Sequence, residues 1–213
     1  MDDLLRRWQY GWGLCRGLPP ALDRRIALDV TLGLPHRDRE LFALPGTTPA
    51  PLIAEVLHAP RPTWLTVTTH QADEAATELR SAGLELFDER KLLMTIDLRQ
   101  HPMPTTQHQV LTTTEGPLER VCVPAWRDSA DGEEAARGMM AVVGDDDAVM
   151  HDIHTSPAYR RQGLGTVVMG TLARRALDRG ASTGLLMATV EGAALYRQLG
   201  WVPQATMLTA KAA

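Results

Sequence analysis

The spacing of hydrophobic residues along the chain changes between a period of two and a period of four. Residues 63–69 read TWLTVTT and alternate between apolar and polar side chains, as a half-buried strand does. In residues 164–179 an apolar side chain returns at every fourth position from Leu164 to Ala176, the stripe of a core-facing helix. The pattern therefore predicts a chain built from both strands and helices.

Glycine and proline mark the boundaries of the elements expected in the first half. The polar segment 99–109 carries two prolines and is interpreted as a linker to the second half. The predicted strands before it are residues 25–35, 40–45, 63–69 and 91–98, and the predicted helices are residues 2–9, 52–58 and 72–83.

The second half has a clearer pattern. The residues GDDD at 144–147 are interpreted as a solvated turn that joins two strands into an antiparallel hairpin. The predicted strands are residues 118–126, 133–143, 148–155, 183–189 and 205–210, and the predicted helices are residues 164–179 and 191–200.

An internal similarity relates the two halves. In both, a strand, a short helix, a glycine and another strand follow one another. The hypothesis is a structural repeat, and the alternative is a chance likeness between two common helix-glycine-strand units. A shift of 117 positions aligns Glu74, Ala76, Arg80 and Gly83 with Glu191, Ala193, Arg197 and Gly200.

Charge and composition narrow the function. The 213 residues carry a formal net charge of −4, to which residues 1–104 and 105–213 contribute −2 each. Because neither half is basic, we expect no nucleic acid partner. No apolar run approaches the roughly 20 residues that span a bilayer, and the N-terminal sequence does not resemble a signal peptide. We therefore expect a cytoplasmic protein with no membrane partner.

The cysteines and tryptophans suggest structural roles. Cys15 and Cys122 provide neither a disulfide framework nor a metal knuckle. Cys122 lies in an apolar strand, which predicts a buried and unreactive thiol. The tryptophans are interpreted as core or interface residues, namely Trp8, Trp12, Trp64, Trp126 and Trp201.

The stretch SPAYRRQGLG at residues 156–165 predicts an anion site. It joins a strand to a helix, where free backbone N–H groups and the helix dipole attract negative charge. Gly163 and Gly165 let the backbone approach a ligand closely, and Arg160 and Arg161 add positive charge. A phosphate or pyrophosphate suits this turn, whereas the Gly-Lys-Ser/Thr of a P-loop and the third glycine of a dinucleotide fingerprint are absent.

The pattern Arg160-x-x-Gly163-x-Gly165 resembles R/Q-x-x-G-x-G/A, the acetyl-CoA pyrophosphate motif of the GNAT superfamily of N-acetyltransferases. ALYRQLGW at residues 194–201 resembles a helix end of the same family, and the resemblance covers roughly residues 107–213. It implies an α/β (α+β) fold with a mixed, mostly antiparallel twisted sheet flanked by helices. The donor-binding residues that it implies are Ile153, His154, Thr155, Arg160, Arg161, Gln162, Gly163, Leu164, Gly165 and Thr166.

The first half has no R-x-x-G-x-G motif, but its residues 63–98 resemble the end of a GNAT core. In the second half there is no room for the two helices that usually follow the first GNAT strand. We therefore interpret residues 1–104 as a degenerate, ligand-free GNAT-like lobe and residues 105–213 as the acetyl-CoA-binding GNAT domain.

The resemblance implies direct transfer of an acetyl group from acetyl-CoA to a primary amine of a small molecule or protein. The alternatives are a catalytically silent CoA-binding sensor or scaffold, and transfer of a larger acyl group. The acceptor groove is expected between the N-terminal half and the loops around residues 127–134, which do not identify the amine. Because GNAT relatives often dimerise, a homodimer stays open.

Tyr196 stands where family members place a tyrosine general acid, and its phenol would protonate the leaving thiolate. The candidate bases are Asp152, His154, His151 and Glu134, or a base acting through water. Asp152 and His154 complete the expected catalytic set with Tyr196. Strand alternation places His151 on the opposite face from Asp152 and His154, so we expect no metal ion shared by the two histidines.

Overall fold

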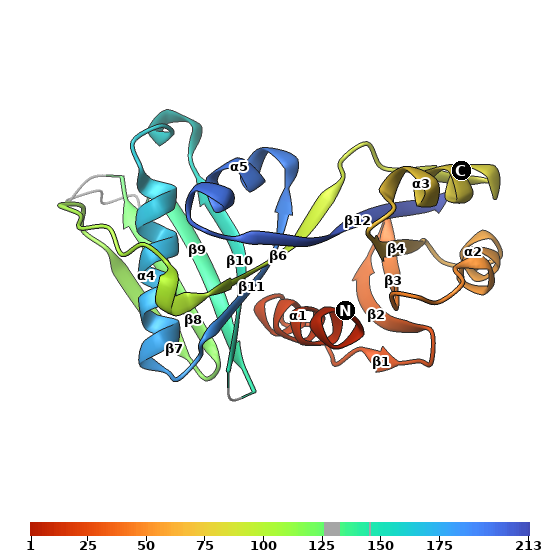
Figure 1. Cartoon of the computed structure of the whole chain (residues 1–213), viewed down its shortest axis with the longest axis horizontal. Coiled ribbons are helices and arrows are strands. Elements are labelled where there is room, and N and C mark those ends of the chain that lie inside the picture. Colours follow the sequence, from red (N-terminus) through yellow and green to blue (C-terminus); the bar gives the residue numbers. More distant parts are fainter. Residues whose placement is uncertain (126–132, 145) are drawn as a thin grey trace.

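The computed structural model of the chain describes residues 1–125, 133–144 and 146–213. These residues form one twelve-stranded, mostly antiparallel mixed sheet flanked by helices, which confirms the α/β (α+β) fold expected from the sequence (Figure 1). The helices are α1 (Asp2–Cys15), α2 (Ala50–Leu57), α3 (Ala72–Ser81), α4 (Leu164–Asp178) and α5 (Val190–Gln198). The strands are β1 (Leu22–Asp23), β2 (Ala27–Leu34), β3 (Arg37–Ala43), β4 (Thr63–Thr69), β5 (Leu84–Leu86), β6 (Lys91–Asp97), β7 (Leu111–Glu115), β8 (Leu118–Pro124), β9 (Glu134–Val143), β10 (Asp147–Thr155), β11 (Thr183–Thr189) and β12 (Val202–Ala212).

The same succession of elements occurs in both halves of the chain. In the first half, β2 and β3 are antiparallel, α2 follows, and β4 returns parallel to β3. In the second half, β9 and β10 form the expected antiparallel hairpin, α4 follows, and β11 returns parallel to β10. The strand order across the sheet is β1-β2-β3-β4-β12-β6-β11-β10-β9-β8-β7, and β5 pairs with β12.

The two halves exchange their last strands at the centre of the sheet (Figure 1). β12, from the end of the chain, lies between β4 and β6, and β6, from the first half, lies between β12 and β11. Gly83 and Gly200, which follow α3 and α5, share a left-handed φ of 89°. These features support the hypothesis of a structural repeat. The boundary between residues 104 and 105 stays a prediction, because one sheet runs through both halves.

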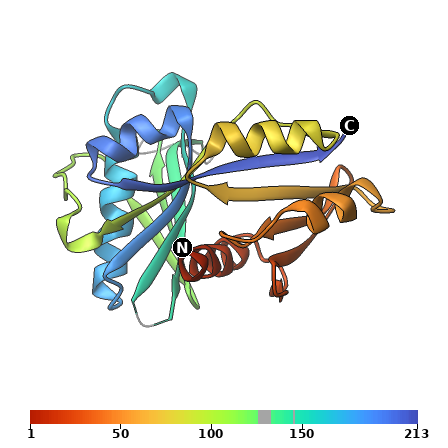
Figure 2. The ribbon, with the colours of Figure 1, turned by 45° about the vertical axis from the view of Figure 1, so that its right-hand side comes forward.

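Helix α1 covers one face of the sheet, and α2 to α5 cover the other (Figure 2). The core under α1 draws side chains from both halves, among them Phe42 of β3 and Val149 of β10. The rings of Trp8 and Trp12 stack with their centroids 5.8 Å apart, and Phe42 meets both edge-on. Helix α1 therefore joins the two halves through aromatic packing.

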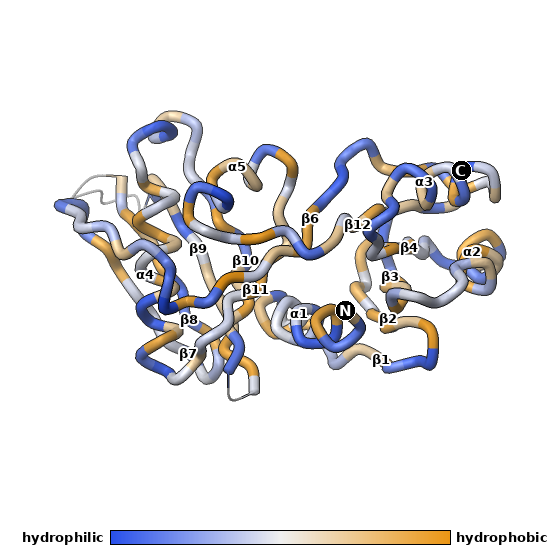
Figure 3. Tube along the Cα trace, in the orientation of Figure 1, coloured by the Kyte–Doolittle hydropathy of each residue, from blue (hydrophilic) through white to orange (hydrophobic). Residues whose placement is uncertain are grey.

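The apolar stripe of residues 164–179 lies on the inner face of α4, and hydrophobic residues also recur along the central strands (Figure 3). Its members at positions 164, 168, 172 and 176 are at most 2% exposed, which confirms the helix and its orientation. Outside this stripe, an added Cβ at Gly170 would lie 2.6 Å from Pro104 Cδ. The segment 99–109, expected to be a linker, therefore packs on α4.

Three interpretations of short segments need correction. Strand β7 was not predicted, because its residues LTTTE are all exposed and show no alternation. Asp147 was placed in a solvated turn, but its carboxylate is buried and accepts hydrogen bonds from Arg7. Cys122 is half-buried rather than buried. Residue 145 of the same turn lies outside the described residues.

The tryptophan interpretation is confirmed for Trp8, Trp12 and Trp201, which are all buried. Trp64 is partly buried and packs against Phe87, with the ring centroids 4.3 Å apart. Trp126 lies outside the described residues. None of the described helices is both long and apolar enough to cross a membrane.

Candidate functional site

The parallel strands β10 and β11 separate halfway along their length. They pair through three residue pairs that end at Val149 and Leu185, and then both strands continue without pairing to each other. The pairing of β10 with β9 shifts its register between His151 and His154, and Asp152 between them has a left-handed φ of 49°. This irregularity is a β-bulge, which bends a strand locally. The bulge lies where β10 leaves β11.

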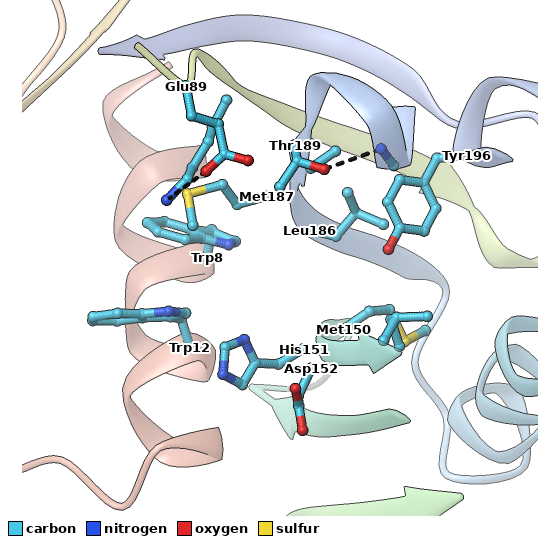
Figure 4. A pocket seen from close by; sticks show the side chains of 14 residues that line it. Trp8, Trp12, Glu89, Met150, His151, Asp152, Leu186, Met187, Thr189 and Tyr196 are labelled. Atoms are coloured by element: carbon cyan, nitrogen blue, oxygen red, sulfur yellow. Dashed lines mark hydrogen bonds and ion pairs between the residues drawn. The ribbon is translucent and has the colours of Figure 1, made fainter. Parts of the chain in front are cut away.

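A cleft of about 280 Å³ lies between the separating strands (Figure 4). Helix α1 lines it with Trp8 and Trp12, and α5 lines it with Tyr196. The first half also contributes Glu89 and Lys91, at the start of β6, whose charged groups are 3.9 Å apart. Both halves of the chain therefore build one cleft.

The turn before α4 has the geometry of an anion site. Arg161 and Gly163 have left-handed φ angles of 64° and 77°, and such alternating conformations point successive N–H groups into one concavity. The first four N–H groups of a helix have no partner within it. An added Cβ at Gly165 would meet Leu195 of α5 at 3.0 Å and Thr155 of β10 at 3.7 Å. Gly165 thus lets α4 pack closely against α5 and β10, while an added Cβ at Gly163 would meet no atom within 4 Å, so the open side of the turn lies at Gly163.

The equivalent region of the first half is built differently. Strands β3 and β4 stay paired through five residue pairs up to Ala43, the end of β3, so no cleft separates them. Helix α2 has Pro49 as its N-cap and Pro51 in its first turn. Proline has no N–H group, so this helix start offers fewer donors to an anion. Both differences support the interpretation of a ligand-free first half.

Tyr196 lies at the α5 side of the cleft, where its hydroxyl points into the open space (Figure 4). The side chain is only 9% exposed and packs against Trp201, with the ring centroids 6.2 Å apart. Burial raises the pKa of Tyr196 to about 12. The phenol is therefore a proton donor over the whole neutral range.

The bulge changes which residues of β10 share a face. His151 lies opposite Met139 on β9, and His154 lies opposite Arg137. Met139 and Arg137 are two residues apart on a regular strand, so their side chains point to the same face. Since opposite residues of a pair share a face, His151 and His154 both lie on the α1 side of the sheet. The expectation of opposite faces was wrong, because alternation stops at the bulge.

The candidate bases differ in their surroundings. His151 lines the cleft and points toward Trp12, whereas His154 is not among the cleft-lining residues (Figure 4). Asp152 also lines the cleft, but its carboxylate accepts a hydrogen bond from Arg137 at 2.9 Å. Glu134 forms an ion pair with the same arginine, with 3.5 Å between Arg137 Nη1 and Glu134 Oε2. Among the described residues, no group of three or more acidic, histidine or cysteine side chains is arranged to hold a metal ion.

The other expected donor-binding residues lie around the turn. Ile153 lines the cleft, and Arg160 Nε donates to the Thr155 carbonyl at 3.4 Å. Gln162 is exposed and Thr166 is partly buried, while the side chain of Leu164 belongs to the core.

The contribution of α1 and β6 to the cleft had no signal in the sequence. Trp8 and Glu89 are far from residue 151 along the chain, and only the exchange of strands and the docking of α1 bring them together. The loop expected near residues 127–134 lies largely outside the described residues, which include only residues 133 and 134 of it.

Comparisons with known proteins agree with this geometry. The model of the acetyltransferase (GNAT) family matches residues 85–201, more than half of the chain. This range begins in β5 and includes the diverging strands, the turn and α5. No curated protein sequence matches the chain.

Solved structures share the fold at low sequence identity. A GCN5-related N-acetyltransferase from Kribbella flavida has a TM-score of 0.69 and 16% identity, covering 100% of this chain and 95% of that one. A tandem GNAT protein from the clavulanic acid biosynthesis pathway has a TM-score of 0.60 and 14% identity, covering 88% of this chain and 79% of that one. A GCN5-related N-acetyltransferase from Sphaerobacter thermophilus has a TM-score of 0.59 and 11% identity, covering 97% of this chain and 90% of that one. Since the family match covers more than half of the sequence and the fold agrees, the chain belongs to the GNAT family of acetyltransferases.

Proposed function

We propose that this chain is an N-acetyltransferase that moves an acetyl group from acetyl-CoA to a primary amine of a small molecule or protein by direct attack. The observation that carries the proposal is the cleft between β10 and β11, which lies beside an anion-binding turn and has the Tyr196 hydroxyl inside it. GNAT members generally use acyl-CoA donors, and acetyl-CoA supplies an activated thioester.

The turn and the free edge of β10 hold the donor in this proposal. The N–H groups of residues 163–166 bind the diphosphate, with Arg160 and Arg161 beside it. The pantetheine arm pairs with residues 153–155, because β11 has left this edge of β10 unpaired. A backbone N–H at the bulge donates to the thioester carbonyl and stabilises the negative charge that develops on its oxygen.

Tyr196 serves as the general acid. A leaving thiolate has an ordinary pKa near 8.5, so a phenol with a higher pKa must be positioned close to it to donate efficiently. Burial keeps Tyr196 protonated, and its hydroxyl points into the cleft rather than into the core (Figure 4).

His151 serves as the base in this proposal, ahead of His154. Burial lowers the pKa of His151, and the neighbouring Arg16 lowers it further, so the imidazole is neutral near pH 7 and accepts a proton. His154 lies outside the cleft lining, and the carboxylate of Asp152 is held by Arg137. Asp152 instead contributes negative charge at the point where a protonated amine arrives.

Release of free thiol tests the proposal directly. Purified protein is mixed with acetyl-CoA and a panel of primary amines, and thiol is measured with and without each amine. We expect amine-dependent release, and mass spectrometry should find the acetylated amine. Binding of CoA without release on any amine would favour the alternative of a silent sensor or scaffold. Faster release with longer acyl-CoA donors would favour the transfer of a larger acyl group.

A further inference from the structure

Two arginines from different elements lie near His151, which lines the cleft. Arg16 caps the C-terminus of α1, and its guanidinium carbon lies 5.0 Å from the centre of the Trp12 ring, which lines the cleft. Arg120 of β8 lies opposite Met139 of β9, and Met139 in turn lies opposite His151 of β10. Arg120 Nη1 lies 3.6 Å from Met139 Sδ, so the guanidinium lies over β9, beside the strand that carries His151.

Neither of these two guanidinium groups forms an ion pair within the part of the chain that the structure describes. Among the residues that the structure describes, no carboxylate lies within 4.0 Å of either Arg16 or Arg120. Arg137, two residues before Met139 on β9, differs from both arginines because it forms ion pairs with Asp152 and Glu134. Burial and repulsion from Arg37 lower the pKa of Arg16, and attraction to Glu40 opposes this shift only in part. An incoming anion would relieve this repulsion.

We propose that the acceptor amine carries a carboxylate, as an α-amino acid does, and that this carboxylate binds between Arg16 and Arg120. The inference rests on the proposed function and names its substrate class. Guanidinium groups form strong charge-assisted hydrogen bonds with carboxylates. A doubly charged phosphate is less suitable, because Glu134 and Asp152 line the groove next to Arg120 and repel two negative charges more strongly than the single charge of a carboxylate.

The same groove has room for the remainder of such an acceptor. It has a volume of about 340 Å³ and meets the cleft at Asp152, which lines both. Leu111, Cys122 and Met139 give it an apolar floor. Burial and the neighbouring Glu134 raise the pKa of Cys122 to about 11, so the thiol stays protonated and behaves as an apolar wall. The amino acid side chain would lie along this floor.

The test compares common α-amino acids with their carboxamides, which keep the amine and side chain but lose the negative charge. The measured quantity is kcat/KM for thiol release with acetyl-CoA. For the best amino acid, we expect the acid to exceed the amide by roughly ten- to a hundredfold, the range of one or two charge-assisted hydrogen bonds. Arg16→Gln and Arg120→Gln should each lower the ratio of kcat/KM for the acid to kcat/KM for the amide by roughly tenfold.

Arg174→Gln is the matched control, because Arg174 is exposed on α4, on the other face of the sheet. This variant should keep the preference for the acid. Equal use of acid and amide by the wild type overturns the inference and leaves the acetyltransferase proposal standing. An equal loss on acid and amide in the Arg16 and Arg120 variants also overturns it, because the effect would then be structural. If none of the amines in the panel supports thiol release, both proposals are overturned.

A binding measurement on the wild type avoids any dependence on how the variants fold. The charged groups around His151 are Arg16 from α1, Arg120 from β8, Asp152 on its own strand, and Glu89 and Lys91 across the cleft. A carboxylate bound between the two arginines adds negative charge and should raise the pKa of His151 in an NMR titration with CoA present. The matching carboxamide should leave it unchanged, and equal shifts would contradict the inference.

Discussion

Arg7 of α1 donates to both carboxylate oxygens of Asp147 at the start of β10, at 2.9 and 3.1 Å. The Asp147 side chain is 7% exposed, so the guanidinium supplies charge balance that water cannot. A few residues further along, Gly11 packs so closely on Val149 that an added Cβ would overlap with its Cγ2. This pair and this contact hold α1, which carries two cleft-lining tryptophans, against the strand that bears the bulge.

The first prediction concerns this ion pair. Arg7→Ala leaves the Asp147 carboxylate without its partner and should lower the free energy of unfolding by about 2 kcal/mol, as for hydrogen bonds to charged groups. Urea denaturation followed by tryptophan fluorescence measures the change. Arg6→Ala is the control, because Arg6 pairs with the exposed Asp23 and such surface pairs contribute less than about 1 kcal/mol. Equal losses in the two variants would show that the Asp147 pair does not hold α1.

The second prediction concerns the turn before α4. Gly163→Ala places a Cβ at a left-handed position, which costs roughly 1–2 kcal/mol, so KM for acetyl-CoA should rise about tenfold with kcat little changed. Gly180→Ala introduces the same backbone strain at φ 91° after the other end of α4 and should leave KM unchanged. Steady-state kinetics with varied acetyl-CoA distinguish the two. If both variants raise KM alike, general destabilisation and not the turn would be responsible.

The third prediction concerns Tyr196. Tyr196→Phe removes the proton donor and should lower kcat by roughly 10²–10⁴-fold with little change in KM for the donor, the range typical of general acid catalysis. Tyr10→Phe on the exposed side of α1 should leave kcat unchanged. Because the pKa of Tyr196 is about 12, we expect no alkaline loss of kcat from this group below pH 10. Full activity in the Phe variant would remove Tyr196 from the mechanism.

The fourth prediction concerns pH and stability. Burial lowers the pKa of His101, which is 3% exposed, below its ordinary value of 6.5, although its hydrogen bond with the Pro102 carbonyl opposes the shift. Between the folded and unfolded pKa values, the unfolded chain binds a proton that the folded chain does not. The free energy of unfolding should therefore fall as the pH drops below about 6.5.

Denaturation in urea at several pH values measures this slope. His101→Gln should reduce the slope without abolishing it, because burial also lowers the pKa of His151. His108→Gln, at an exposed position, should leave the slope as it is. A slope unchanged by His101→Gln would show that this histidine does not contribute to it.

The elements that could be predicted from the sequence are those whose burial pattern is local. Residues 63–69 alternate and form β4 over the same range, and the period-four stripe marks the buried side of α4. β7 could not be predicted because an exposed edge strand of threonines has no buried face to leave a pattern. The pairing of β12 with both β4 and β6 depends on long-range contacts that no local window contains.

The same distinction separates the site residues that could be predicted from the sequence from those that could not. The turn at residues 160–166 could be recognised because glycine spacing directly reflects backbone conformation, as the φ of Gly163 shows. The position of His151 in the cleft could not, because one bulged residue, Asp152, reverses the alternation on which the assignment rested. Arg16 and Arg120, the arginines near His151, lie at the end of α1 and in β8 and share no sequence motif.

The crossing of β6 and β12 has a consequence for the integrity of the polypeptide. A protease that cleaved the chain between residues 104 and 105 would leave each fragment with a strand hydrogen-bonded into the other, so the nicked protein should elute from a sizing column as one particle and melt in one step. Lys91 of β6 belongs to the first fragment yet borders the same cleft as Tyr196 of the second. Substitutions in the first half could thus alter the cleft through the strand that this half contributes to it, and the sequences of the two halves would have to change together.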